Sequence, residues 1–250
     1  MIEIKNISKK YGRQQVLDNI TISFERNQSV ALIGPNGSGK TTIIKTILGM
    51  VIPDSGTLTV NGENVRGHER YRRIIGYMPQ ISRFPENMTV RHLFQLMKDL
   101  RKEDGKSMDE ELYNTYDLRS FEHKTMKTLS GGMRQKTSAA LAFLFNPQII
   151  ILDEPTAGLD PLSVEILKSK IKKEKGNGKV VLITSHILSD LDEIISDVVY
   201  LQEGTIRLYH TLEELMQRTG ESKVSKAIAH WMMSGGENSN GKEQNEQVIK

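Results

Sequence analysis

Gly34-Pro35-Asn36-Gly37-Ser38-Gly39-Lys40-Thr41-Thr42 lies between a predicted strand and a predicted helix. Residues 29–33 before it are mostly apolar, and residues 43–48 after it place apolar side chains at helical spacing. The stretch has the spacing G-x-x-x-x-G-K-[ST], in which glycines let successive backbone N–H groups point inward while the helix N-terminus adds partial positive charge. A chance glycine turn before a helix is the alternative. The flanking strand and helix favour a phosphate-binding loop formed by residues 34–42.

Two side chains at the end of this loop would act directly on a bound nucleotide. We expect Lys40 to reach the β- and γ-phosphates, and the hydroxyl of Thr41 to ligate Mg²⁺. The sequence therefore predicts a nucleoside triphosphate and Mg²⁺ as cofactors, held at the junction of one strand and one helix.

A pair of acids follows a second predicted strand. Residues 149–152 are continuously apolar, as a central parallel strand covered on both faces should be, and they end at Asp153 and Glu154. Ligands of open α/β sheets bind at the carboxyl ends of the strands, so these acids should face the phosphate loop. We expect Asp153 to hold Mg²⁺, directly or through water, and Glu154 to polarise the attacking water. Two acids in an ordinary loop are the alternative, which the abrupt end of the apolar strand disfavours.

The composition limits the class of protein. The 250 residues contain no cysteine, which excludes disulfides and thiolate metal sites. Lys and Arg number 34 against 31 Asp and Glu, a net charge of +3 that is too balanced to predict a nucleic-acid partner. No apolar run approaches the roughly 18–20 residues that cross a bilayer, and residues 1–5 are strand-like rather than a secretory leader. We expect a soluble chain that needs another chain for any membrane-spanning role.

The periodicity of the sequence predicts an α/β chain with a helical insert. Alternating apolar residues near the N-terminus indicate antiparallel strands, and from about residue 84 the period becomes helical, with Thr89 as a helix cap. Ser107 and Glu110 resemble a capping box for a second helix. The lysine-rich helix segment 168–175 is most simply a solvated face. The expected parts are an α/β core over 1–83 and 146–220, a helical part over about 84–145, a short C-terminal helix over 221–233, and a disordered tail over 234–250.

A second glycine-rich motif links the chain to a known family. Leu129-Ser130-Gly131-Gly132-Met133-Arg134-Gln135 resembles the signature of the nucleotide-binding subunits of ABC transporters. Its fifth place is often glutamine in that family; here it is Met133, with Gln135 two places on. With the other motifs in the family's order, the resemblance covers roughly the first 210 residues. It implies a P-loop NTPase of ABC type, with a RecA-like, mostly parallel sheet, an antiparallel β subdomain and a helical insert.

The resemblance also implies how the site is completed. In the family, two subunits pair head to tail, and ATP lies between the phosphate loop of one and the signature of the other. Ser130, Gly131 and Gly132 of one copy would then meet the ATP held by Gly39, Lys40 and Thr41 of its mate. One chain would hold half of each site, so we expect a head-to-tail homodimer.

Three further positions match family motifs. Gln80 matches the glutamine that touches Mg²⁺ or the attacking water, and His186 matches the histidine that hydrogen-bonds the γ-phosphate. Tyr11 matches the aromatic residue that stacks on adenine, although an aromatic side chain there could simply pack. Residues 157–160 match the loop that contacts the mate across the dimer.

Function follows from the same resemblance. We expect an ATPase that energises a polytopic membrane partner, which would hold the chain at the cytoplasmic face of the inner membrane. A soluble ABC ATPase acting on DNA or ribosomes is the alternative, but the long coiled-coil insertion or second cassette of those relatives is absent from this sequence. A regulator that binds nucleotide without turnover is a third hypothesis, disfavoured by the presence of both Glu154 and His186.

The region around the glutamine suggests a subgroup. Residues 76–80 and 83–90 look most like the exporter-type ATPase that matures nitrous-oxide reductase. In that group the ATPase works with a membrane protein and a periplasmic accessory protein to assemble a copper centre. Exporter ATPases for drugs, lipids or haem-type substrates are the alternative, since these residues face the partner and none of them names copper or sulfur chemically.

Overall fold

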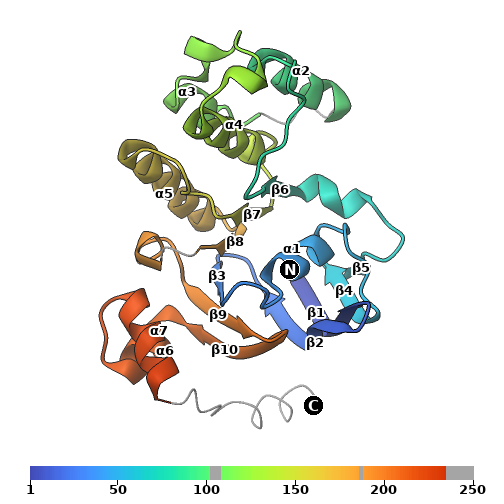
Figure 1. Ribbon diagram of the computed structural model, residues 1–250, viewed down its shortest axis with the longest axis vertical. Coiled ribbons are helices and arrows are strands. Elements are labelled where there is room, and N and C mark those ends of the chain that lie inside the picture. Colours follow the sequence, from blue (N-terminus) through green and yellow to red (C-terminus); the bar gives the residue numbers. More distant parts are fainter. Residues whose placement is uncertain (102–107, 186–187, 235–250) are drawn as a thin grey trace.

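The computed structural model describes residues 1–101, 108–185 and 188–234 (Figure 1). Three sequence predictions lie outside these ranges: the Ser107 half of the capping box, the catalytic role of His186 and the disorder of residues 235–250. In the described part of the chain, no helix is both long enough and apolar enough to cross a bilayer.

The central sheet has six strands in the order β10 (Thr205–Thr211), β9 (Asp197–Gln202), β3 (Ser29–Ile33), β8 (Val180–Thr184), β7 (Ile149–Asp153) and β6 (Ile75–Met78). Neighbouring strands from β9 to β6 are parallel, and only the edge strand β10 runs antiparallel to its neighbour. Strands β3, β7 and β8 are buried along their whole length, which explains the apolar runs at 30–33, 149–152 and 180–183.

A smaller antiparallel sheet packs beside the first. Its order is β2 (Gln14–Phe24), β1 (Ile2–Tyr11), β4 (Ser55–Val60) and β5 (Glu63–Asn64). The predicted alternation is present, because Ile2 and Ile4 are buried while the residues between and after them are more exposed. Asn61 and Gly62 form the β4–β5 turn with positive φ, as the Asn-Gly pair predicts.

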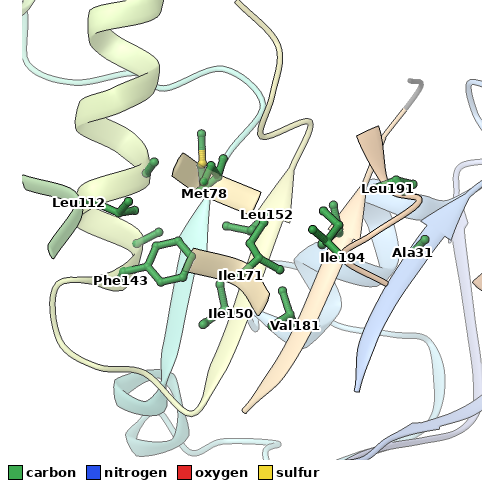
Figure 2. Packing of buried hydrophobic residues seen from close by; sticks show 14 of the residues in the cluster. Ala31, Met78, Leu112, Phe143, Ile150, Leu152, Ile171, Val181, Leu191 and Ile194 are labelled. Atoms are coloured by element: carbon green, nitrogen blue, oxygen red, sulfur yellow. The ribbon is translucent and has the colours of Figure 1, made fainter. Parts of the chain in front are cut away.

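Two hydrophobic cores lie on opposite faces of the central sheet. On β7, Ile149 and Ile151 join the core that also contains helix α1 (Lys40–Ile47) and the antiparallel sheet, while Ile150 and Leu152 face the other way. Figure 2 shows the second core, where Ile150 and Leu152 meet side chains from helix α4 (Gly131–Phe143) and helix α5 (Pro161–Gly176). Successive strand residues point to opposite faces, so β7 contributes side chains to both cores.

The helical part lies at the top of Figure 1, with its helix α4 packed against β6 of the central sheet. Besides α4 it contains α2 (Val90–Arg101), α3 (Glu111–Thr115) and the short 3-10 turns η2 (Leu118–Phe121) and η3 (Met126–Thr128). The expected cap at Thr89 is confirmed, because its hydroxyl accepts a hydrogen bond from His92 N at 3.2 Å. We call this part the helical lobe. Two further 3-10 turns, η1 (Arg70–Ile74) and η4 (Leu188–Asp190), lie before β6 and after β8.

The solvated lysine face predicted for residues 168–175 is wrong at one position. Lys170 is 2% exposed, and its Nζ lies 2.5 Å from Asp109, 2.7 Å from Glu111 and 2.8 Å from Glu174. Burial alone would lower the pKa of Lys170, but hydrogen bonds to these three carboxylates outweigh burial and raise that pKa. The lysine therefore joins α5 to the segment that begins α3, a contact that no local pattern in α5 indicates.

Two helices close the described chain, at the lower left of Figure 1. Helix α7 (Val224–Met233) lies where a short C-terminal helix was expected. Helix α6 (Leu212–Thr219) was not predicted, although Thr211 and Glu214 form a complete capping box at its start. That T-x-x-E pattern was the available signal for α6.

Candidate nucleotide site

The phosphate loop joins β3 to α1 and depends on two glycines. Gly34 has φ +146° and Gly39 has φ +107°, both in the region that L side chains rarely adopt. A Cβ on Gly34 would lie 2.1 Å from the carbonyl oxygen of Leu201, and one on Gly39 would lie 2.8 Å from that of Val16. At these distances a Cβ atom would clash with the neighbouring backbone. The loop can therefore adopt this conformation only with glycine at both positions.

The end of the loop carries the features of an anion site. Gly39 is the N-cap of α1 and supplies no side chain, so the first N–H groups of the helix remain available to a ligand. Within the described residues, the buried Ser38 Oγ has no hydrogen-bond partner. An orphaned hydroxyl beside uncapped helix N–H groups fits a phosphate, whose oxygens accept from both kinds of donor.

Lys40 places a positive charge within the same loop. Its side chain is only 8% exposed, and Nζ donates to the carbonyl oxygens of Gly34 at 2.7 Å and Pro35 at 3.0 Å. Burial lowers the pKa of Lys40, and the nearby charges of Glu154 and Asp153 partly oppose that shift. The ammonium group is therefore held by weak neutral acceptors in a site where an anionic ligand would compete well.

A cleft of about 550 Å³, open to solvent, brings most of the predicted residues together. Its lining comes from the phosphate loop and from the ends of β6 and β7, as expected for the carboxyl edge of a parallel sheet. The lining residues are Val16, Asn36, Gly37, Ser38, Gly39, Lys40, Thr41, Thr42, Gln80, Asp153 and Glu154. A hydroxyl, an amide and a carboxylate from Thr41, Gln80 and Asp153 are oxygen donors of the kind Mg²⁺ prefers.

The two acids at the end of β7 are held by the neighbouring strand. Thr184 Oγ1 donates to Asp153 Oδ1 at 2.5 Å and accepts from Glu154 N at 3.1 Å. Glu154 has φ +54°, a left-handed conformation uncommon for a residue with a side chain. The sequence reasoning assigned no role to Thr184, because only the pairing of β7 with β8 places it opposite Asp153.

The signature motif lies outside this cleft in the same chain. Ser130 caps α4, accepting a hydrogen bond from Met133 N at 3.2 Å, but Ser130, Gly131 and Gly132 do not line the cleft around Lys40. The N-terminus of α4 therefore lies elsewhere on the surface, where Ser130 satisfies one of its backbone N–H groups.

Helix α4 nonetheless contacts the backbone next to the two acids. The buried Gln135 donates to the carbonyl oxygens of Glu154 and Pro155, each at 3.3 Å. Lys136 lies 2.8 Å from Asp160, and hydrogen bonds from Lys136 and Ser163 hold the pKa of Asp160 well below its usual range. Helix α4, which carries the signature, therefore contacts the segment that follows Asp153 and Glu154.

Tyr11 takes no part in the cleft lining. It is the last residue of β1 and 50% exposed, with Lys9 Nζ 5.6 Å from its ring centroid. An exposed aromatic face of this kind can accept a flat ligand, although no described contact joins it to the phosphate loop.

A mostly parallel sheet with a glycine loop and paired acids at the carboxyl ends of its strands defines a P-loop NTPase. Residues 17–157 match the family described as ABC transporter. The chain belongs to that family.

Relatives with known names support the same assignment. The lipopolysaccharide export system ATP-binding protein of Haemophilus influenzae is 31% identical over 223 residues, which cover 86% of this chain and 92% of that protein. The Nod factor export ATP-binding protein I of Ralstonia nicotianae is 30% identical, over 82% of this chain. The chain spans 65% of the length of that protein and 60% of its counterpart from Sinorhizobium fredii.

Solved structures agree in fold. An ATP-binding subunit of an ABC transporter superimposes with a TM-score of 0.85 at 29% identity, over 93% of this chain and 99% of that one. A bacterial ABC transporter cassette solved as a dimer gives a TM-score of 0.75 at 25% identity, over 85% and 99%. The RecA-like sheet, the antiparallel subdomain and the helical lobe are thus those of an ABC-type P-loop NTPase.

Proposed function

We propose that this chain hydrolyses ATP to ADP and phosphate and so energises a transporter. The single observation that carries the proposal is the cleft in which the phosphate loop meets Asp153, Glu154 and Gln80. The division into an ATPase domain over 1–220 and a C-terminal helix over 221–233 belongs to the same proposal.

Each residue has a distinct role in this proposal. Lys40 and the α1 N–H groups bind the β- and γ-phosphates, and Thr41, Asp153 and Gln80 hold Mg²⁺. When bound, Mg²⁺ neutralises charge on the phosphate oxygens. Glu154 accepts a hydrogen bond from the attacking water and orients it toward the γ-phosphorus, with His186 as the γ-phosphate donor expected from the sequence.

The active assembly in this proposal is a head-to-tail homodimer. Ser130, Gly131 and Gly132 lie outside the cleft of their own chain, so a second copy has to supply them if they bind ATP. The solved relative described as dimeric favours this arrangement. Tyr11 then stacks on the adenine through its exposed ring.

A groove between the core and the helical lobe offers a docking place for the membrane partner. Its volume is about 790 Å³, and apolar side chains dominate the lining, among them Phe84, Leu93, Met97 and Phe145. The same β6 that contributes Tyr77 to the groove leads to Gln80 in the cleft. We infer that a cytoplasmic helix of a polytopic membrane subunit binds there, which keeps the chain at the cytoplasmic face of the inner membrane.

The cargo is a finer proposal. Relatives named for Nod factor export and lipopolysaccharide export favour an exporter. The resemblance of residues 76–80 and 83–90 to the nitrous-oxide reductase maturation group favours work with a periplasmic accessory protein on that enzyme's copper centre. Deleting the gene in its own host separates the two: loss of nitrous-oxide reduction supports maturation, and unchanged reduction leaves an exporter of another substrate.

Two measurements test the proposed function itself. The purified chain, alone and with its membrane partner, should release phosphate from ATP only when Mg²⁺ is present. Membrane fractionation should yield a bound pool that disappears when the partner gene is deleted. Phosphate release without any partner-dependent membrane pool would favour the soluble ABC ATPase, and binding without release in both preparations would favour a regulator.

A further inference from the structure

We propose that Thr184 is a positioning residue that sets the geometry of both acids in the cleft through one hydroxyl group. The proposal rests on the proposed ATPase function and deepens it. Thr184 ends β8, and its Cα lies opposite that of Asp153 in the parallel pairing of β7 with β8. Thr184, Asp153 and Glu154 are 1%, 6% and 8% exposed, so their mutual hydrogen bonds form where water competes little.

The first consequence concerns the metal ligand. Thr184 Oγ1 donates to Asp153 Oδ1 at 2.5 Å. A bond to one carboxylate oxygen restricts rotation of the carboxylate plane and therefore fixes the direction of the other oxygen. Threonine is suited to this task because branching at Cβ restricts its χ1 angle. The orientation of the Asp153 carboxylate, the proposed Mg²⁺ ligand, is thus set by Thr184 of strand β8.

The second consequence concerns the general base. Successive residues of an extended strand point to opposite faces, yet Asp153 and Glu154 both line the cleft. The left-handed backbone at Glu154, with φ +54°, breaks the alternation. Glu154 N donates both to Thr184 O at 3.2 Å and to Thr184 Oγ1 at 3.1 Å, so one residue supplies both acceptors that hold this turn.

A merely structural threonine is the competing explanation, and three variants separate the two. Thr184→Val keeps the shape and removes the hydroxyl, while Thr184→Ser keeps the hydroxyl. Thr137→Val is the matched control, because Thr137 is fully buried and its hydroxyl donates to the Met133 carbonyl of its own helix at 2.8 Å, away from the acids. All three should fold, and thermal unfolding of each is measured alongside.

The first readout requires neither metal nor turnover. A crystal structure of nucleotide-free Thr184→Val should show the Asp153 carboxylate rotated and the Glu154 backbone shifted, because Glu154 N keeps the Thr184 carbonyl oxygen but loses the hydroxyl as an acceptor. Retention of both conformations would overturn the proposal. If Thr184→Val fails to fold, the same measurement is made on Thr184→Ala, which removes the hydroxyl without adding a methyl group.

The second readout is the gain in ATP affinity that Mg²⁺ confers, measured by calorimetry with and without the ion. Thr184→Val should reduce this gain by about tenfold, as expected for a lost hydrogen bond to a charged group, and lower kcat by about tenfold or more. The affinity for ATP in the absence of Mg²⁺ should stay unchanged, because the phosphate loop is intact. Thr184→Ser should stay within about threefold of the native protein, and Thr137→Val should match it.

Three outcomes count against the proposal. They are an unchanged Mg²⁺ gain and kcat in Thr184→Val, equal losses in Thr184→Val and Thr184→Ser, and a Thr137→Val variant that loses as much as Thr184→Val. If the native protein itself hydrolyses no ATP, the proposed function fails separately, and the nucleotide-free crystal structures still decide whether Thr184 positions the acids.

Discussion

At the scale of single residues, the cleft works by placing opposite charges where neither is fully hydrated. Lys40 is buried between two backbone carbonyl oxygens, and Asp153 and Glu154 lie close enough to affect its pKa. Burial disfavours the charged form of Lys40, and an anionic ligand at its Nζ would favour that form again. The loss of either charge should therefore be felt in nucleotide binding or turnover rather than in the fold.

Lys40→Ala should weaken ATP binding by about tenfold or more, the usual contribution of a hydrogen bond to a charged group. Equilibrium binding of a fluorescent ATP analogue measures it. Lys45→Ala is the control, because Lys45 lies on the same helix α1 but is exposed and outside the cleft. Equal affinities for the Lys40 and Lys45 variants would remove Lys40 from the phosphate site.

Glu154→Gln should leave ATP affinity nearly unchanged and slow hydrolysis by roughly 10²–10⁴-fold, the usual contribution of a general base. The amide keeps the size of the side chain but cannot accept the proton. Phosphate release under saturating ATP measures the effect. Glu203→Gln is matched to it, since Glu203 also has positive φ but lies exposed in the β9–β10 turn. Brisk turnover by the Glu154 variant would show that another group is the base.

At the scale of elements, the helical lobe is joined to the core by charges as well as by apolar packing. Lys170 of α5 holds Asp109 and Glu111 at the start of α3, and Glu174 of its own helix. Glu174 also pairs with Lys179 before β8, and Lys179 donates to Asn146 at 2.5 Å. The network thus runs from the lobe through α5 to the loops that lead into β7 and β8.

Lys170→Met should destabilise the protein by about 3 kcal/mol, because the buried carboxylate of Glu174 loses its closely paired lysine on the same helix. Chemical denaturation followed by circular dichroism measures the change. Lys172→Met is the control: Lys172 is on the same helix, but its side chain is 46% exposed and pairs with Glu193 at the surface, a contact that contributes at most about 1 kcal/mol. Equal stabilities of the two variants would mean that the buried network contributes nothing beyond a surface pair.

At the scale of the whole molecule, one chain holds a nucleotide cleft and a separate signature helix, which makes association part of the proposed chemistry. A slow-turnover variant should accumulate the closed dimer when ATP is bound, because hydrolysis no longer reopens it. A bulky side chain in the signature motif should prevent this association, although the nucleotide cleft of each chain is unchanged.

Glu154→Gln with ATP should sediment as a dimer, and adding Ser130→Phe should return it to a monomer whose own cleft still binds ATP. Analytical ultracentrifugation measures both. Ser120→Phe serves as the control, since Ser120 is exposed elsewhere on the helical lobe. A dimer that persists with Ser130→Phe would place the signature outside the interface.

The local sequence was sufficient for elements whose signal lies within one segment. The phosphate loop, the strand ending in Asp153, the capped helices at Thr89 and Ser130, and the parallel-sheet class follow from glycine spacing, apolar periodicity and caps. These are near-neighbour effects, so a short window contains their cause. Helix α6 was not predicted, although its capping box lies within four consecutive residues and could have been recognised from the sequence.

The amino-acid sequence alone determined the phosphate loop, the two acids and the family. The conformational freedom of glycine and the hydrophobic pattern are both set by residues that are close together in the sequence. Only the tertiary structure decided that Lys170 is buried, that Gln135 holds the backbone after Glu154, and that Thr184 holds both acids. Each of these contacts joins segments at least 19 residues apart. Strand order and helix packing bring such partners together, and no local window contains both.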